Sequence, residues 1–200
     1  MKYFLLPLFM FIVFSASGQT YKPFKVNLSV GYAQPLVTGI SGGVLFALEP
    51  KYGITDHLDV GVRLEGALVA RGVTVNGRTS TGEVNYLGSY LLTGNYVFGK
   101  TKTRPFIGLG GGLYRITSSG LIEITDGQSW EEVTLTAANK WGALLRAGIK
   151  AGHFLVSVEY NAVPASIAHL GSSRLKSRND YLGIKVGFDI GGGKRKLGSE

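Results

Sequence analysis

Apolar residues recur at every second position along most of the chain, which is the pattern of β-strands with two different faces. The alternation is clearest at residues 181–190, where one face carries Leu182, Ile184, Val186, Phe188 and Ile190 and the other carries Tyr181, Gly183, Lys185, Gly187 and Asp189. Similar segments lie at residues 26–32, 44–54, 60–68, 84–98, 105–114, 141–150 and 154–161. The pattern predicts about eight strands, each close to the ~9–11 residues that a tilted strand needs to cross a bilayer. It does not indicate which face of the glycine-rich run 105–114 points outward.

The connections between these segments alternate between short and long. Short links are expected at residues 55–57, 99–104 and 150–153, and long links at residues 33–41, 71–83, 118–139 and 161–180. In outer-membrane barrels the short turns face the periplasm, the long loops face outward, and an even strand count leaves both termini in the periplasm. The connections therefore predict an all-β fold, an eight-stranded antiparallel up-and-down transmembrane β-barrel.

The start of the chain is typical of a secretory signal peptide. Lys2 is followed by an apolar run at residues 4–14 and by small residues at positions 15–18. This run is shorter than the roughly 20 apolar residues of a spanning helix, so cleavage is favoured over an uncleaved anchor. We expect a signal peptide at residues 1–18, a barrel domain at residues 19–190 and a flexible basic periplasmic tail at residues 191–200.

Composition excludes several classes of protein. Glycine accounts for 30 of the 200 residues and charged residues for only 17%, while 44% hydrophobic and 11% aromatic residues argue against a disordered chain. The absence of cysteine excludes disulfides, thiolate zinc sites and cysteine nucleophiles. Without Lys2 the chain has 20 basic and 13 acidic residues, a net charge of +7. Export and the dispersed positions of these charges argue against a nucleic-acid partner.

The charged residues within the strands fall on the faces expected to point inward. The interior of an eight-stranded barrel is just wide enough to be filled by side chains. We expect an ion-pair network there, with glycine on the same faces to leave room, formed by Glu49, Arg63, Glu65, Arg146, Glu159, Lys185 and Asp189, with Lys51 nearby. Turns centred on residues 152–153 and on residue 56 place Arg146 opposite Glu159 and Glu49 opposite Arg63. Such a network would fill the lumen and block a continuous water channel.

Aromatic residues near strand ends are candidates for the girdles that mark the two membrane surfaces, where an apolar ring and a polar tip are both accommodated. The candidates on outward faces are Tyr32, Tyr52, Tyr86, Trp141 and Tyr160. Core packing in a soluble barrel is the alternative role for these residues.

Basic residues in the connections are candidates for contact with anions. Arg174, Lys176 and Arg178 lie in the last long loop, where contact with lipopolysaccharide phosphates and simple solvation are both consistent with the sequence. Residues 100–104 carry Lys100, Lys102 and Arg104 in a short turn, for which solvation is favoured.

The three histidines are the candidates for metal or acid–base chemistry. His57 and His153 fall in short turns and His169 in a long loop, without the spacing of a metal site. We therefore expect no metal and no cofactor. Residues 166–172 could supply a serine nucleophile with His169 as its base, but no orienting carboxylate lies beside them.

Three segments resemble the small eight-stranded outer-membrane barrels, similar to the transmembrane domain of OmpA and to OmpX. They are the strand at residues 105–114, the strand end and turn at residues 52–56, and the final strand at residues 181–188. The chain departs from the family where Phe188 is followed by twelve further residues, because such barrels often end on an aromatic residue.

The resemblance implies a non-enzymatic protein of the bacterial outer membrane with a structural or surface-interaction role. It also implies contact with outer-membrane lipid and lipopolysaccharide, insertion by the barrel assembly machinery, and a monomeric state. Two alternatives stay open. One is a soluble secreted β-barrel that binds a small apolar ligand inside, and the other is an outer-membrane enzyme that modifies lipid A.

Overall fold

The computed structural model describes residues 22–36, 41–75, 78–117, 122–125, 130–133, 138–170 and 173–192. Within these ranges only the backbone is described at residues 69–85, 122–125, 130–133, 167–170 and 173–177. The predicted signal peptide at residues 1–18, and the predicted tail from residue 193 onward, lie outside the described part. In the described ranges no helix is long and apolar enough to cross a membrane.

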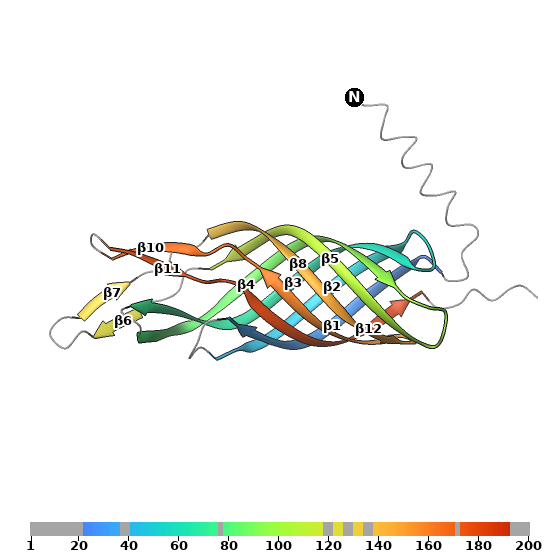
Figure 1. Ribbon diagram of the computed structural model, residues 1–200, viewed down its shortest axis with the longest axis horizontal. Coiled ribbons are helices and arrows are strands. Elements are labelled where there is room, and N and C mark those ends of the chain that lie inside the picture. Colours follow the sequence, from blue (N-terminus) through green and yellow to red (C-terminus); the bar gives the residue numbers. More distant parts are fainter. Residues whose placement is uncertain are drawn as a thin grey trace, which may run out of the picture.

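Eight of the twelve described strands close into an antiparallel barrel, in the order β1-β12-β9-β8-β5-β4-β3-β2 (Figure 1). Their bounds are β1 Phe24–Pro35, β2 Gly43–Gly53, β3 Leu58–Val75, β4 Arg78–Val97, β5 Thr103–Ile116, β8 Ala138–Ala151, β9 Phe154–Ala162 and β12 Tyr181–Gly191. Pairing of β1 with β12 over eleven residue pairs joins the first strand to the last, so the sheet has no free edge. The prediction of an eight-stranded antiparallel barrel is confirmed.

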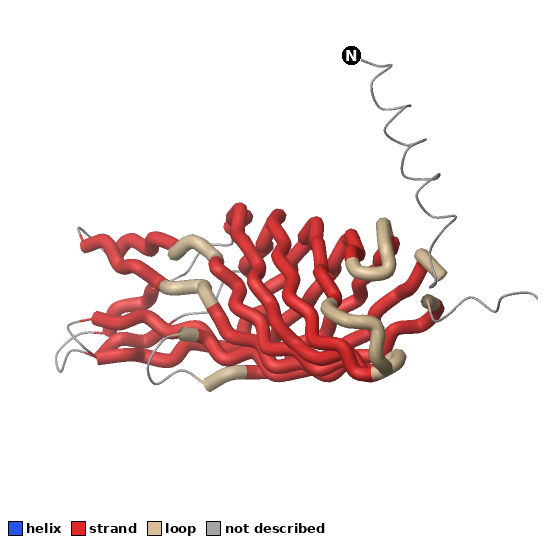
Figure 2. The backbone as a smooth tube through the Cα atoms, turned by 45° about the vertical axis from the view of Figure 1, so that its right-hand side comes forward, coloured by secondary structure: helices blue, strands red, loops and turns tan. Residues whose placement is uncertain are grey.

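The two ends of the barrel differ (Figure 2). One end carries the connections at residues 54–57, 98–102 and 152–153, together with the start of β1 and the end of β12, and we call it the short-turn end. At the opposite end, the long-loop end, two further hairpins pair β6 Ile122–Thr125 with β7 Trp130–Val133, and β10 Ser166–Leu170 with β11 Ser173–Ser177.

The expectation of a long loop at residues 71–83 is wrong. β3 and β4 continue through this segment as a paired hairpin, with a shift of register between Ala70 and Gly72, and only residues 76–77 connect them. The sequence held a signal for this: Asn-Gly between Val75 and Arg78 is a preferred two-residue hairpin connection, and β-branched residues flank it. The many polar residues of this segment suggest a loop, and they mask the hairpin signal.

Side chains alternate strictly between the lumen and the outer wall. In β12 the residues Leu182, Ile184 and Val186 are exposed on the outer wall, whereas Lys185 and Asp189 are buried. The run whose facing the sequence left open resolves in the same way. Ile107 and Leu109 point outward, and Phe106, Gly108, Gly110, Gly112 and Tyr114 point inward.

The sequence predicts a polar lumen, but only part of the lumen is polar. Toward the long-loop end its inward residues form an apolar lumen layer made of Ala33, Leu45, Ala67, Leu87, Leu91, Tyr114, Ile116, Leu144, Val163 and Tyr181. Toward the short-turn end Val97, Phe106 and Leu155 form a smaller cluster. The charged residues lie between and around these clusters. The expectation failed because the inward face of one strand can carry both kinds of residue, as Leu45 and Glu49 do in β2.

Glycine at inward positions makes this packing geometrically feasible. A methyl group placed on Gly31 would lie 2.6 Å from Cγ and 2.9 Å from Cα of Lys185 on the paired strand β12. By contrast, a methyl group on Gly94 of β4 would meet no atom within 4 Å. Gly31 therefore lies where the seam between β1 and β12 leaves no room for a side chain.

We predict that Gly31→Ala destabilises the closed barrel, because the added methyl group must push Lys185 and its backbone away from β1. Folded barrels of this kind migrate differently on detergent gels before and after boiling, so the temperature at which the folded band disappears measures stability. That temperature should fall for Gly31→Ala and stay unchanged for Gly94→Ala, the matched control. An equal fall in both variants would contradict the packing argument.

Candidate functional site

The central ion-pair network of the lumen consists of Glu49, Arg63, Glu65, Arg146, Glu159 and Lys185, which are all buried. Its first tie joins β2 to β8, which lie four strands apart in either direction around the barrel. Arg146 donates from Nη1 to Glu49 Oε2 at 2.8 Å and from Nη2 to Oε1 at 2.5 Å. This bidentate geometry is the strongest that a guanidinium and a carboxylate can adopt, and here it spans the full width of the lumen.

A second tie joins β3 to β9, which are also diametrically opposed. Arg63 Nη2 donates to Glu159 Oε2 at 2.6 Å and also contacts the Glu65 carboxylate. Lys185 from β12 lies 2.8 Å from Glu159 Oε2 and 3.1 Å from Glu65 Oε2. Two cations and two carboxylates thus form one cluster at the barrel axis.

Neutral side chains form further hydrogen bonds with these charged groups. Thr93 donates its hydroxyl to Glu49 Oε1 at 2.6 Å, and Arg146 Nε donates to Asn95 Oδ1 at 2.7 Å. Tyr181, a member of the apolar lumen layer, donates its hydroxyl to Glu65 Oε1 at 2.6 Å. The hydrogen bonds therefore link the charged centre to the apolar layer, which suits a region where unpaired polar groups are costly.

The strand register agrees with the sequence, but the ion-pair partners differ. Arg146 stands opposite Glu159 as predicted, and the pairs on either side of Glu49 hold the predicted register between β2 and β3. Yet Arg146 Nη1 lies 3.8 Å from Glu159 while its two closest contacts go to Glu49. Arg146 and Glu159 stand side by side on neighbouring strands, and both point toward the barrel axis. The long guanidinium of Arg146 therefore reaches Glu49 on the far wall more directly than it reaches Glu159 beside it.

A second group of charges lies nearer the short-turn end. Asp189 contacts Lys51 at 3.1 Å, accepts a hydrogen bond from Asn27 at 2.9 Å, and is also paired with Lys150. Lys25 lies 2.6 Å from Asp59. We had not predicted the roles of Lys25, Asp59 and Lys150. The available signal was that all three lie on inward faces, with Lys25 opposite Lys51 in the strand register.

Little free volume is found within the charged part of the lumen. A cavity of about 20 Å³ is lined by residues of both charged groups, including Glu49, Arg146, Lys150 and Asp189. A water molecule needs about 10–15 Å³ of such space, so this cavity suits one water. Buried nitrogens without a partner among the described residues, such as Arg63 Nε and Asn95 Nδ2, can use waters of this kind.

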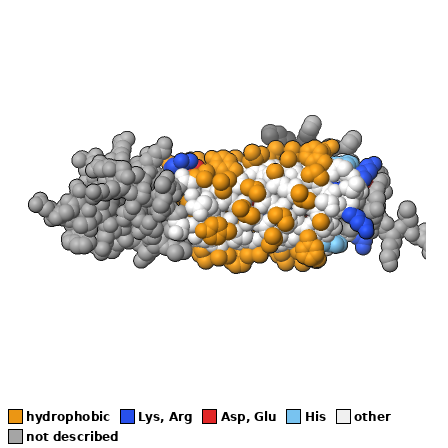
Figure 3. Space-filling view, turned by 60° about the horizontal axis from the view of Figure 1, so that its bottom comes forward, with side chains coloured by type: hydrophobic (Ala, Val, Ile, Leu, Met, Phe, Trp, Pro, Cys, Tyr) orange, Lys and Arg blue, Asp and Glu red, His pale blue; other side chains and the backbone are white. Residues whose placement is uncertain are grey.

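The outer wall of the barrel is an apolar belt (Figure 3). Tyr32, Tyr86, Trp141 and Tyr160 are exposed on its outward face toward the long-loop end, and Trp141 is the most exposed of them. Tyr52 lies at the other end of the barrel and is half-buried. These are the positions at which the sequence placed the aromatic girdle.

Most aromatic residues at the short-turn end were missed in the sequence. These residues form the aromatic belt of the short-turn end. It comprises Phe24, Tyr96, Phe98, Phe154 and Phe188, which are exposed on outward faces. Tyr96 packs edge-on against Phe98 with ring centroids 4.9 Å apart, and Phe154 packs edge-on against Phe188 at 5.0 Å. The missed signal was a phenylalanine or tyrosine beside each short turn.

Two of the histidines complete this belt. His57 stacks on Tyr96 and its Nδ1 lies 2.8 Å from the carbonyl oxygen of Val97. His153 stacks on Phe188 in the same way, with Nδ1 2.8 Å from the carbonyl oxygen of Asp189. Each histidine thus ties a short turn to the end of another strand. Among the described residues no group of three or more potential ligands is placed to hold a metal.

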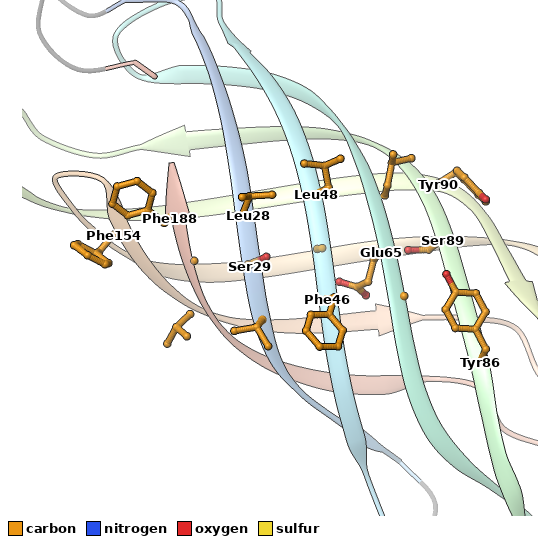
Figure 4. Close-up of a pocket in the computed structure, with 16 residues that line it drawn as sticks. Leu28, Ser29, Phe46, Leu48, Glu65, Tyr86, Ser89, Tyr90, Phe154 and Phe188 are labelled. Carbon is orange, nitrogen blue, oxygen red and sulfur yellow. The ribbon is translucent and has the colours of Figure 1, made fainter. Parts of the chain in front are cut away.

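A shallow hollow of about 770 Å³ lies against the outer wall of β12, β1, β2, β3 and β4 (Figure 4). Its outward lining is apolar and includes Leu28, Phe46, Leu48, Tyr90 and Phe188. The ring of Tyr86 covers two outward glycines, because methyl groups on Gly66 and Gly88 would lie 2.8 Å and 3.1 Å from its ring carbons. Inward residues also line it, namely Ser29, Ala47, Glu65 and Ser89, so the hollow extends from the outer wall into the sheet.

The candidate lipopolysaccharide contacts are described only in part. The side chains of Arg174 and Lys176 lie outside the described ones. Arg178 is largely exposed and donates from Nε to Asp180 Oδ1 at 3.0 Å, with a second contact from Nη2 to Oδ2. The hydrogen bond to Asp180 and the charge of its carboxylate raise the pKa of the Arg178 guanidinium. Arg178 therefore carries its positive charge beside Asp180, just before β12.

Ser166, the serine of residues 166–172 whose side chain is described, is not an exposed hydroxyl. Ser166 is buried and its Oγ accepts a hydrogen bond from Asn179 Nδ2 at 3.0 Å. Asn179 also donates to the carbonyl oxygen of Pro164 at 2.7 Å, so these contacts join residues 164–166 to the segment before β12. The side chain of His169 lies outside the described ones.

No protein-family profile and no curated protein sequence matches the chain. Solved structures do match it. Neisserial surface protein A superposes with a TM-score of 0.53 at 15% identity, covering 84% of this chain and 97% of that one. OprG, an outer membrane protein from Pseudomonas aeruginosa, superposes with a TM-score of 0.54 at 12% identity, covering 86% and 98%.

The chain has the fold of the small eight-stranded outer-membrane β-barrels. Like them, this barrel is a closed sheet with every barrel strand paired on both sides, as the hydrocarbon core of a membrane requires. Its apolar outer wall and charged lumen are those of a barrel embedded in a membrane, with lipid against the outer wall. A soluble barrel with an apolar ligand cavity needs the opposite arrangement, so that alternative is contradicted.

We predict that breaking one cross-lumen tie costs more stability than removing it completely. Arg146→Met leaves Glu49 buried without its cation, which should lower the free energy of unfolding by about 3–5 kcal/mol. The double variant Glu49→Leu/Arg146→Leu strands no charge and should recover most of that loss. Urea unfolding of the barrel in lipid vesicles measures both.

Arg115→Met serves as the control, because Arg115 is an exposed outward residue. Its unfolding free energy should stay close to that of the wild type. A double variant as unstable as Arg146→Met would contradict the assignment of the tie.

Proposed function

We propose that this protein is a non-catalytic surface barrel. Its lumen is closed by side chains, and its long-loop end interacts with molecules outside the cell. The observation that carries this proposal is the length of β3 and β4. These strands have 18 and 20 residues, whereas ~9–11 residues suffice to cross a bilayer. The surplus projects beyond the apolar belt as a paired hairpin, alongside the hairpins β6–β7 and β10–β11.

The filling of the lumen supports a closed barrel. The bidentate tie between Glu49 and Arg146 crosses the axis at one level, and the cluster of Arg63, Glu65, Glu159 and Lys185 crosses it beside that tie. The apolar lumen layer lies toward the long-loop end. A passage for ions needs a continuous polar path, which these contacts interrupt.

The projecting hairpins support an interaction role. Two-stranded hairpins pair their own backbone groups, so they hold a defined shape in water better than an unpaired loop of the same length. We propose that this end faces the cell exterior and the short-turn end faces the periplasm, as in other barrels of this architecture. We also propose that the protein is a monomer inserted by the barrel assembly machinery.

Lipopolysaccharide is the proposed partner at the external membrane surface. Arg174 and Lys176 lie in β11, and Arg178 directly follows that strand and precedes β12, which begins at the level of the outer girdle. Arginine and lysine bind phosphate groups through charge-assisted hydrogen bonds. The exposed guanidinium of Arg178 is the described member of this set.

The closed lumen predicts that the wild-type protein forms no ion-conducting channel in planar lipid bilayers. Replacing the tie with alanine, in Glu49→Ala/Arg146→Ala, should also give no conductance steps, because the second cluster and the apolar lumen layer still cross the lumen. Leu92→Ala/Leu109→Ala is the control, since both leucines are exposed on the lipid-facing wall. Stable wild-type conductance, or steps in the control variant, would refute the closed lumen.

The proposed lipopolysaccharide contact predicts a weaker effect of that lipid in Arg174→Gln/Lys176→Gln/Arg178→Gln. Added lipopolysaccharide should raise the temperature at which the folded gel band of the wild type disappears. The rise should be largely lost in this variant. Lys194→Gln/Arg195→Gln/Lys196→Gln removes the same charge from the predicted periplasmic tail and should keep the full rise. Equal losses in both variants would mean that only net charge matters.

A further inference from the structure

The mouth of the barrel at the short-turn end holds a basic pocket that the proposed surface role does not use. Its volume is about 420 Å³. Six cationic side chains and two carboxylates line it, namely Lys22, Lys25, Lys100, Lys102, Arg104 and Lys150 with Asp56 and Asp59. In Figure 3 lysine and arginine gather at this end, at the right of the view, beyond the apolar belt.

The carboxylates of this end neutralise mainly the inner cations. Lys25 is paired with Asp59, and Lys150 with Asp189, so these contacts form the floor of the basic pocket. Lys22, Lys100 and Lys102 form no ion pair among the described residues and stand nearer the opening. The pocket therefore presents a surplus of positive charge to whatever enters it.

The wall that carries two of these lysines is ordered. The turn between β4 and β5 is held by a hydrogen bond from Phe98 N to Pro105 O at 2.9 Å and by one from the Thr101 hydroxyl to Thr103 O at 2.5 Å. Gly152 N donates to Lys102 O at 3.1 Å, which ties this turn to the neighbouring turn between β8 and β9. Lys100 and Lys102 thus extend from a fixed backbone on the pocket wall.

Arg104 adds a guanidinium to the same wall. It follows this turn in β5, is buried at 8% exposure, and lines the pocket together with Lys150 of the paired strand. Arginine presents several donors in a fixed plane, whereas lysine is a compact point charge. Together they suit an anion that has several acceptor oxygens and more than one negative charge.

We propose that the basic pocket binds the phosphate group of an anionic ligand. A monocarboxylate needs only one cation, whereas a phosphate uses several cations and donors at once. The volume lies within the range of small-molecule sites, about 300–1,000 Å³. The phosphate can come from a soluble phosphorylated compound or from a phospholipid headgroup, because the aromatic belt of the short-turn end places this mouth near headgroup depth.

The test uses pyrophosphate as the probe and the whole barrel in uncharged maltoside micelles. Calorimetry should detect saturable binding to the wild type that weakens as salt is added. Lys100→Gln/Lys102→Gln should weaken binding by about tenfold or more, since each lost cation removes a charge-assisted contact. Arg115→Gln/Lys140→Gln removes the same charge at the long-loop end and should bind within about twofold of the wild type.

A lipid arm distinguishes the two sources of phosphate. In nanodiscs that contain phosphatidylglycerol, phosphorus NMR should show a perturbed headgroup signal with the wild type and not with Lys100→Gln/Lys102→Gln if the headgroup is the ligand. Unperturbed lipid with retained pyrophosphate binding assigns the pocket to a soluble compound. Failure of both probes, or equal weakening by both double variants, overturns the site. Neither result bears on the long-loop end, so the proposed surface role is tested separately.

Discussion

The narrow bore of an eight-stranded barrel is the constraint on which the rest of the structure depends. Side chains from opposite walls meet at the axis, so no inward residue can be chosen independently of the strand facing it across the lumen. Arginine is long enough to reach the opposite wall, and in this barrel two of them do so. Glycine and alanine then become necessary beside the long side chains, as at Gly31 next to Lys185.

The same constraint makes the protein the reverse of a soluble domain. Apolar residues cover its outside because lipid, and not water, is the solvent there, while the charged residues are enclosed and must neutralise one another. A buried ion pair contributes little net stability compared with apolar residues of the same size, although loss of one partner is costly. The network is therefore better understood as a set of contacts that fixes how opposite walls meet. The apolar lumen layer supplies ordinary packing beside it.

Local patterns in the sequence were enough to predict the strands, their alternation and the register. The five alternating pairs of the last strand and the short turn at Gly152-His153 each depend on residues close together in the chain. The pairing of Arg146 with Glu49 could not be predicted in this way, because it depends on strand order around the closed barrel and on side-chain reach. The hairpin at residues 71–83 was missed for a different reason, since its sequence is mostly polar and gives little of the apolar alternation on which the prediction relied. The stacking of His57 on Tyr96 and of His153 on Phe188 could not be predicted either, because each contact joins a turn to a strand that is distant in the chain.

The residues joined across the lumen are far apart along the chain. Glu49 and Arg146 are separated by 97 residues, Arg63 and Glu159 by 96, and Glu65 and Lys185 by 120. Early strands therefore carry charges whose partners belong to strands near the other end of the sequence. While the barrel is being built, these charges need water or another protein around them. The buried charges can leave water only when the sheet curls shut, so closure and entry into the lipid must be coupled events.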